Sequence, residues 1–151
     1  MSSQVFINIT MNNKSDFFIN LAKMQAIMYR RLDSSLWWLS FNEYIILKYL
    51  DESDTGKLRR IDLADLVWLT ASWVTRLLLP MEKIWLVTRE VNPEDARVSY
   101  VVLAKWWKQK LDDAKERMDL IWCSIIPDDM PTTLDSLNAS LQIIARNLSW
   151  R

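Results

Sequence analysis

The sequence contains almost no glycine and no histidine, and both absences restrict what the chain can be. Its 151 residues include one glycine, Gly56, no histidine and one cysteine, Cys123. Without histidine there is neither a histidine general base nor a zinc site of the usual His and Cys type. One cysteine forms no disulfide within the chain, and no pair of carboxylates stands in a spacing that suggests acid–base chemistry. We therefore expect no metal, no cofactor and no enzymatic activity.

Long apolar runs and a secretion signal are also missing. No stretch approaches the roughly 18 residues that cross a bilayer, and the polar N-terminus lacks a basic segment followed by an apolar one. We therefore expect a cytoplasmic protein without a membrane partner. Half of the residues are hydrophobic and a quarter are charged, which is typical of a soluble globular chain whose length suits one domain.

The formal net charge of zero hides a basic segment in the middle of the chain. Residues 57–110 hold ten Lys or Arg against six Asp or Glu, and the remaining residues are acidic by the same margin. A basic segment within a neutral chain is typical of a nucleic-acid-binding surface. Chance clustering of charge is the alternative.

Apolar residues recur at helical intervals in the first third of the chain. They predict a helix over residues 16–36, with an N-cap at Ser15 or Asp16. A second helix is predicted over residues 41–50, where Ser40 and the glutamate three residues later form a capping box. The polar run that follows, which contains the only glycine, is predicted to be a loop.

Two helices are predicted after residue 108, because their apolar residues are spaced alternately three and four apart, as at a helix–helix seam. We assign residues 15–36 and 109–151 to dimerisation helices of a homodimer; packing within one subunit is the alternative. The residues expected at the dimer interface are Phe17, Leu21, Leu134, Leu137, Leu141, Ile144 and Leu148.

The segment between these helices, residues 40–108, is predicted to be a separate lobe. A short helix capped by Asp62 is followed by a helix over residues 71–83 that Thr70 caps. The second helix buries an apolar face and carries Ser72 and Arg76 on the opposite one. The hydrophobic period then changes to two, which predicts strands over residues 85–91 and 98–103 joined by a polar turn. The order of these elements is that of a winged helix-turn-helix, so the predicted fold class is mainly α with a small β-hairpin wing.

Specific residues between Leu58 and Lys108 resemble the DNA-binding core of the MarR family of transcriptional regulators. The outer helices agree with that family in pattern only. The matching residues are Leu63 and Ala64 in the first helix of the motif, Thr75 and Arg76 in the second, Met81, Glu82 and Lys83 at its end, Val87 and Arg89 in the first strand, and Asp95 and Arg97 in the wing.

The resemblance implies a homodimer that binds double-stranded DNA and regulates transcription, most often as a repressor. A helix in the major groove needs small polar groups and a long cation on its outward face, and a wing arginine suits the narrow minor groove of A·T-rich DNA. We expect Asp95 to hold Arg97 in place by a charge-assisted bond; a plain surface pair is the alternative. The predicted DNA-binding residues are Thr70, Ser72, Trp73, Thr75, Arg76, Asp95 and Arg97.

The resemblance fails systematically at glycine, because the family has glycine where this chain has Trp68, Trp73, Trp85 and Trp107. Nine tryptophans accompany the single glycine. Trp68 would be strained if its φ is positive, whereas Trp85 is expected to tolerate strand geometry. Replacement of glycine by tryptophan and natural divergence of a paralogue are both open explanations.

Two alternatives for function remain at this point. The chain either binds DNA, as the resemblance implies, or is a protein-interaction module that kept the fold and lost DNA binding. The resemblance also implies a pocket for a small aromatic effector, for which Trp37, Trp38 and the methionine-rich first helix are candidates. Plain hydrophobic core is the alternative for those side chains.

Overall fold

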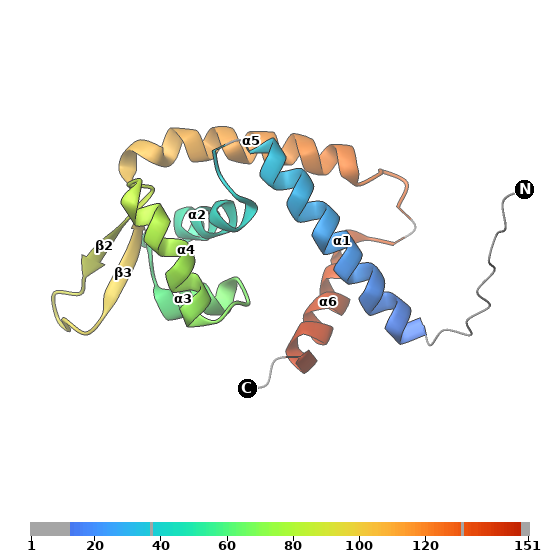
Figure 1. Ribbon diagram of the computed structural model, residues 1–151, viewed down its shortest axis with the longest axis horizontal. Helices are drawn as coiled ribbons and strands as arrows, with labels where there is room; N and C mark the ends of the chain where they lie inside the picture. The colour runs from blue at the N-terminus through green and yellow to red at the C-terminus, as the bar shows by residue number, and fades with distance from the viewer. Residues whose placement is uncertain (1–12, 37, 131, 149–151) are drawn as a thin grey trace, which may run out of the picture. The chain divides into compact units, whose positions relative to one another are not determined.

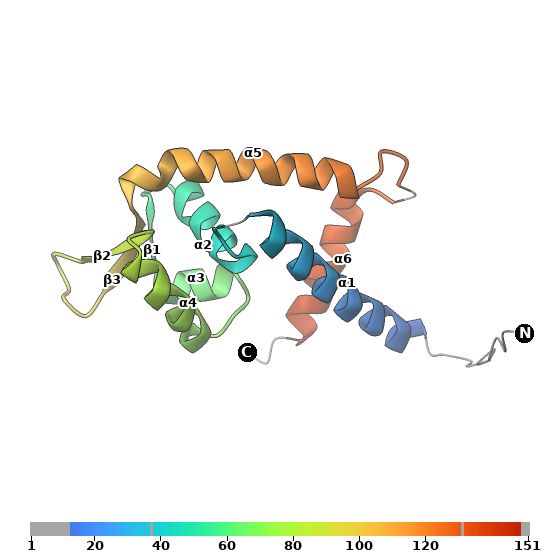
Figure 2. The same cartoon turned by 45° about the horizontal axis from the view of Figure 1, so that its top comes forward.

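The computed structural model describes residues 13–36, 38–130 and 132–148. The contacts divide the chain into two compact units, Met1–Leu111 and Asp112–Arg151. No helix in the described ranges is both long and apolar enough to span a bilayer. The elements, seen in Figures 1 and 2, are α1 (Asn13–Ser35), α2 (Phe41–Glu52), β1 (Lys57–Arg59), α3 (Arg60–Leu66), α4 (Ala71–Lys83), β2 (Val87–Val91), β3 (Ser99–Leu103), the 3₁₀ helix η1 (Lys105–Trp107), α5 (Lys108–Ile125) and α6 (Leu134–Leu148).

The start of α2 confirms the predicted capping box. The Glu43 amide donates to Ser40 Oγ at 3.3 Å, and the Ser40 amide donates to Glu43 Oε2 at 2.8 Å. The prediction for α1 is wrong in detail, because that helix begins at Asn13. Ser15 and Asp16 therefore lie inside the first helical turn and do not cap it.

A third strand, β1, was not predicted. Residues 57–59 pair with β3 in antiparallel register, Leu58 opposite Val101, so the sheet has the order β1-β3-β2. A strand of three residues is too short to show a period of two, so the sequence there predicts the end of a loop and the start of a helix. As a result, α3 begins at Arg60 with Arg59 as its N-cap residue, and Asp62 does not cap it.

The hairpin of β2 and β3 confirms the predicted wing. Val87 pairs with Leu103 at its base and Val91 with Ser99 at its outer end. Its base is anchored in the core, since Val87 and Val101 are buried and the Ala104 amide donates to the Leu86 carbonyl at 3.1 Å. The outer half is exposed on both faces, and Figure 1 shows it projecting beyond α4.

The core of the first unit lies where α2, α3, α4 and the base of the sheet meet. The apolar face predicted for α4 is buried at Val74, Leu78 and Met81. Leu63 and Ala64 of α3 are buried as well. Because this packing fixes α3 against α4, the opposite face of α4 is left to solvent.

In the second unit, α6 has no buried residue in the described range. Every leucine of its predicted seam is exposed, and Ile144 is half-buried. In the first unit, Phe17 is exposed and Leu21 is half-buried on α1. Apolar seams that stay exposed in a single chain are available for a partner.

Candidate nucleic-acid interface

Thr70 begins α4 as predicted. Its hydroxyl accepts a hydrogen bond from the Trp73 amide at 3.2 Å while its own backbone is extended. This cap satisfies one of the unpaired amides at the helix start. It also fixes the first turn of α4, the part that a recognition helix presents to base edges.

The exposed face of α4 carries Ser72 and Arg76, four residues apart and therefore on one side of the helix. Neither side chain has a recorded partner among the described residues. Thr75 differs from the expectation, because it is half-buried and its hydroxyl donates to the Ala71 carbonyl at 2.8 Å. Its oxygen is thus left as an acceptor only, so it suits a base amino group better than a phosphate.

The turn of the wing is held by its own side chains. Asn92 Oδ1 accepts the Glu94 amide at 3.0 Å, and Asp95 Oδ1 accepts the backbone amide of Arg97 at 2.9 Å. The bond expected between Asp95 and the guanidinium of Arg97 is therefore a bond to its main chain. Asp95 shapes the loop, and the side chain of Arg97 is exposed.

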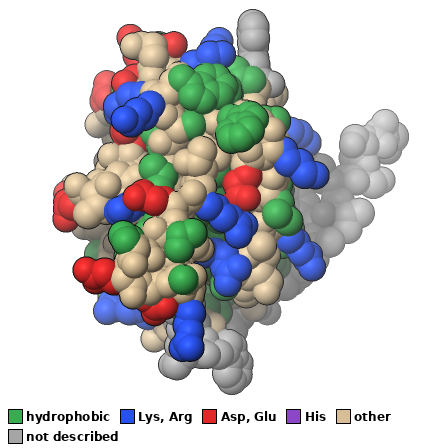
Figure 3. Space-filling view, turned by 90° about the vertical axis from the view of Figure 1, so that its left-hand side faces the viewer, with side chains coloured by type: hydrophobic (Ala, Val, Ile, Leu, Met, Phe, Trp, Pro, Cys, Tyr) green, Lys and Arg blue, Asp and Glu red, His purple; other side chains and the backbone are tan. Residues whose placement is uncertain are grey.

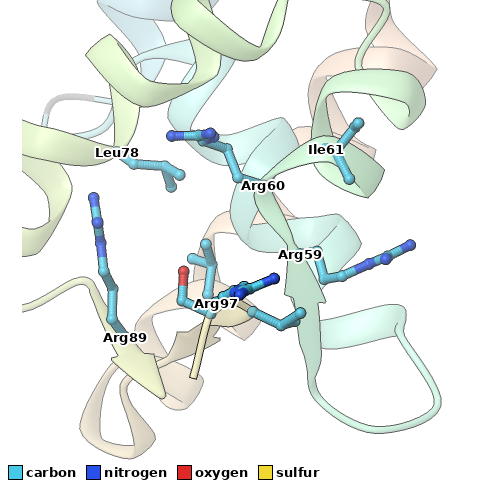
Figure 4. A pocket seen from close by; sticks show the side chains of 9 residues that line it. Arg59, Arg60, Ile61, Leu78, Arg89 and Arg97 are labelled. Carbon is cyan, nitrogen blue, oxygen red and sulfur yellow. The ribbon is translucent and has the colours of Figure 1, made fainter. Parts of the chain in front are cut away.

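An open cavity of about 440 Å³ lies between the start of α3, the middle of α4 and one side of the wing (Figure 4). Figure 3 faces the end of the molecule from which the wing projects, and Lys and Arg side chains lie across the middle of this face. The residues around the cavity include four arginines and four apolar side chains: Arg59, Arg60, Ile61, Leu78, Arg89, Arg97, Val98, Ser99 and Val101.

Two of these arginines are held by carboxylates. The Arg59 guanidinium donates twice to Asp62, at 2.8 Å each, and Arg89 Nε donates to Glu82 Oε1 at 2.6 Å. The hydrogen bonds from Arg59 lower the pKa of Asp62 below its ordinary range, and the same contact raises the pKa of Arg59. No ion pair of Arg60 or Arg97 occurs within the described ranges. The sequence alone does not single out Arg60, and it indicates Arg89 only as part of the family pattern, because the cavity forms only once α3 packs beside the wing.

Two tryptophans occupy the same backbone position at the ends of α3 and α4. Trp68 has φ 56° and Trp85 has φ 60°. After each, the next amide bonds back to the carbonyl five residues earlier: Leu69 to Ala64 at 3.0 Å and Leu86 to Met81 at 2.9 Å.

This pattern is the Schellman motif, whose left-handed residue is usually glycine. The expectation that Trp85 adopts strand geometry is therefore wrong. The left-handed backbone costs each tryptophan about 1–2 kcal/mol.

The other two tryptophans at expected glycine positions have no such constraint. Trp73 lies in the first turn of α4 and Trp107 at the end of η1, and neither has a positive φ. Trp107 packs against Trp38 and Trp106, with ring centroids 5.0 and 4.5 Å away, and its Nε1 is buried without a recorded partner in the described part of the chain. Lys110 Nζ lies over the Trp107 ring at 4.9 Å. Trp37, the other residue expected in an effector pocket, lies outside the described residues.

Within the described ranges, no three side chains of the His, Cys, Asp and Glu types come together to hold a metal ion.

Comparison with solved structures identifies the fold. No family model matches the sequence, and no curated protein does. AbsC, a MarR family transcriptional regulator from Streptomyces coelicolor, matches with a TM-score of 0.78 at 24% identity over 91% of this chain and 95% of that one. Sco3205, a MarR family transcriptional regulator from the same organism in complex with DNA, matches with a TM-score of 0.79 at 22% identity. The match covers 92% of this chain and 90% of that one. The transcriptional regulator BldR from Sulfolobus solfataricus matches with a TM-score of 0.71 at 20% identity, over 89% of this chain and 96% of that one.

These likenesses establish a winged helix-turn-helix flanked by terminal helices, which confirms the predicted fold class. It is the fold of the MarR-family transcriptional regulators. The similarity extends over almost the whole of each chain, so it includes the outer helices as well as the lobe.

Proposed function

We propose that this protein is a sequence-specific regulator of transcription that binds double-stranded DNA, with α4 in the major groove and the wing in the adjacent minor groove. The observation that carries the proposal is the outward face of α4. A capped helix there presents Ser72 and Arg76 without recorded partners, beside a hairpin with an exposed arginine. Sco3205, which has the same fold, was solved in complex with DNA.

The regulation that we expect is repression, because a protein seated across both grooves excludes other proteins from the same site. The alternative function is a protein-interaction module that has lost DNA binding. Exposed indoles at Trp68, Trp73 and Trp85 on the lobe favour that alternative, since large exposed apolar groups are common at protein interfaces.

A mobility-shift experiment with a pool of random duplexes separates the two functions. The proposal expects a shifted band for the full chain and a large loss of it for Arg76→Ala. Arg30→Ala is the matched control, because Arg30 is an exposed arginine of α1 outside the lobe. No shift at low salt for the unmodified chain would favour the interaction module.

We further propose that the active form is a homodimer joined through its terminal helices. Support comes from the exposed apolar residues of α1 and α6, among them Phe17, Leu134 and Leu148. Such an interface would bury well over about 1,000 Å², as stable dimers do. Sedimentation at micromolar concentration tests this proposal, and a folded monomer there would contradict it.

The cluster of Trp38, Trp107 and Lys110 is the best-supported place for a small aromatic effector. Two indoles offer ring faces and the ammonium group offers a cation for an aromatic carboxylate. Titration with benzoate tests this proposal. Saturable binding that Lys110→Gln weakens would support it, and binding unaffected by that change would oppose it.

A further inference from the structure

We propose that the cavity between α3, α4 and the wing binds an oxyanion through Arg60 and Arg89, and that in the DNA complex this oxyanion is a backbone phosphate. This inference rests on the proposed function, since it names the part of the DNA that the cavity meets. A free phosphate or phosphorylated metabolite has the same chemistry, so the experiment below separates the two sources.

The position of the cavity supports a phosphate. A recognition helix in the major groove and a wing in the next minor groove lie on either side of one sugar–phosphate strand. That strand must therefore pass between α4 and the wing. The cavity is formed there, with Leu78 of α4 on one side and Arg89, Arg97 and Ser99 of the wing on the other.

The available donors support an oxyanion. Figure 4 shows the side chains of Arg60 and Arg89 extending toward Leu78, whereas that of Arg59 extends away. Arg60 has no recorded ion pair among the described residues. Arg89 uses only Nε in its bond to Glu82, so both of its terminal nitrogens remain for a ligand.

Neighbouring charges and surfaces fit the same interpretation. Two nearby carboxylates, Asp62 and Glu82, are each engaged by one arginine, and Glu90, next to Arg89 in the sequence, pairs with Lys57. Apolar side chains such as Leu78 and Val101 form much of the remaining lining. Charge-assisted hydrogen bonds are stronger where water is partly excluded.

The test compares Arg60→Gln with Arg30→Gln in the full chain, since both remove one exposed arginine. Duplex binding is measured across a series of salt concentrations, and binding of inorganic phosphate is measured by NMR titration. If Arg60 contacts a DNA phosphate, Arg60→Gln weakens binding to all sequences alike, about tenfold at low salt. It also lowers the slope of log K against log salt by about one. Arg30→Gln leaves the slope unchanged.

Each result then has one meaning. An unchanged slope, together with phosphate binding that Arg60→Gln abolishes, supports the cavity with a free anion as its ligand. An unchanged slope and phosphate binding independent of Arg60 overturns the proposal. If the unmodified chain binds no duplex, the proposed function fails, and the phosphate titration alone still decides on the cavity.

A second inference comes from the backbone and is independent of the cavity. We infer that glycine occupies positions 68 and 85 in the protein as its own cell makes it. Three residues in the described ranges have positive φ: Gly56, Trp68 and Trp85. A bulky residue in that region is an outlier, and here two occur at the same position of two Schellman motifs.

The side chains give no compensation for this conformation. The indoles of Trp68 and Trp85 are 58% and 66% exposed, and neither makes a recorded hydrogen bond in the described ranges. The chain contains one glycine and nine tryptophans. Their combined share of the residues is close to the roughly 7% that glycine alone usually has in a protein. The meaning of a codon such as UGA differs between genetic codes. If the gene uses such a codon, translating it with the wrong code would place tryptophan wherever the cell inserts glycine.

Peptide masses of the protein purified from its own cells test this inference. Trypsin releases residues 61–76, which contain Trp68 and Trp73, and residues 84–89, which contain Trp85. The inference expects each peptide to be lighter by the difference between a tryptophan and a glycine residue at positions 68 and 85. Peptides with tryptophan at these two positions would overturn it. The peptide of residues 118–146, whose single tryptophan, Trp122, lies within α5 and not at an expected glycine position, serves as the internal comparison.

Discussion

Arg89 of the wing donates its Nε to Glu82 at the end of α4, and the two atoms are 2.6 Å apart. This ion pair joins the two elements that are proposed to enter neighbouring grooves. It also places a carboxylate next to one of the arginines of the cavity. The pair is partly exposed, so its contribution to folding stability is at most about 1 kcal/mol, and its main effect is on charge.

Glu82→Gln should therefore change DNA binding more than stability. The substitution removes a negative charge beside Arg89, so a phosphate in the cavity meets a larger net positive charge. We expect tighter binding to random-sequence duplex and a salt dependence steeper by about one unit, with little change in Tm. Fluorescence anisotropy at several salt concentrations measures this. Weaker binding at every salt concentration would mean that the pair serves to position the wing.

Arg97→Ala should weaken binding more on A·T-rich flanks than on G·C-rich flanks. The side chain is exposed on the wing, and a minor-groove arginine responds to the narrow groove of A·T-rich DNA. A phosphate contact would weaken binding to all sequences alike. A competition assay between duplexes with the two kinds of flanking sequence measures this difference. Equal losses of affinity on both would mean that Arg97 contacts the DNA backbone.

The double substitution Trp68→Gly with Trp85→Gly should stabilise the fold. Each change relieves about 1–2 kcal/mol of left-handed strain and exchanges an exposed indole for hydrogen. The Tm should rise by roughly 5–15 °C in calorimetry. Trp106→Gly is the control, because that exposed residue has no positive φ and should give no increase. A Tm that falls in the double variant would show that the indoles stabilise the fold.

Trp68→Gly with Trp73→Gly should strengthen specific DNA binding without changing the dimer. Removing the Trp73 indole opens the outward face of α4, although glycine in a helix costs up to about 1 kcal/mol. That cost opposes the relief at Trp68, so the Tm should hardly move. Titration of one operator at one salt concentration compares parent and variant. Weaker binding by the variant would make the tryptophans working parts of the interface.

Acid should remove the contribution of the Arg59–Asp62 pair. The hydrogen bonds from Arg59 lower the pKa of Asp62 in the folded state. The pair therefore stabilises the fold above the unfolded-state pKa of aspartate, and this stabilisation is lost as the pH falls through the lower folded-state value. The effect is small, since both side chains are more than a third exposed. Urea unfolding of Asp62→Asn and the parent should differ near pH 7 and converge near about pH 2.

Much of the fold could be predicted because its signals are local. The capping box at Ser40, the apolar face of α4 and the change of period at the wing each lie within a few residues. The strand β1 could not be predicted, since three residues show no period and its pairing with β3 is a long-range contact. The positive φ of Trp85 was missed because a tryptophan hides the usual signal of a Schellman motif.

The candidate site was predicted only where it is continuous in sequence. Ser72 and Arg76 stand on the expected face of α4, but their contact with DNA remains a prediction. Arg60 and Arg89 are 29 positions apart in the chain, and only the packing of α3 beside the wing brings them to one cavity. The role of Asp95 depends on the conformation of the turn, in which its carboxylate accepts a hydrogen bond from the backbone amide of Arg97 and not from the guanidinium.

Selection of bound duplexes from a random pool, followed by affinity measurement at one physiological salt concentration, tests the central claim most directly. A dimer that reads DNA with two copies of α4 should enrich a near-palindromic site, with half-sites about 10 base pairs apart or a multiple of that spacing. The selected site should bind at least about a thousandfold more tightly than a shuffled duplex, and Arg76→Ala should abolish most of that difference. No enrichment, or equal affinity for selected and shuffled duplexes, would contradict the claim that this chain recognises a DNA sequence.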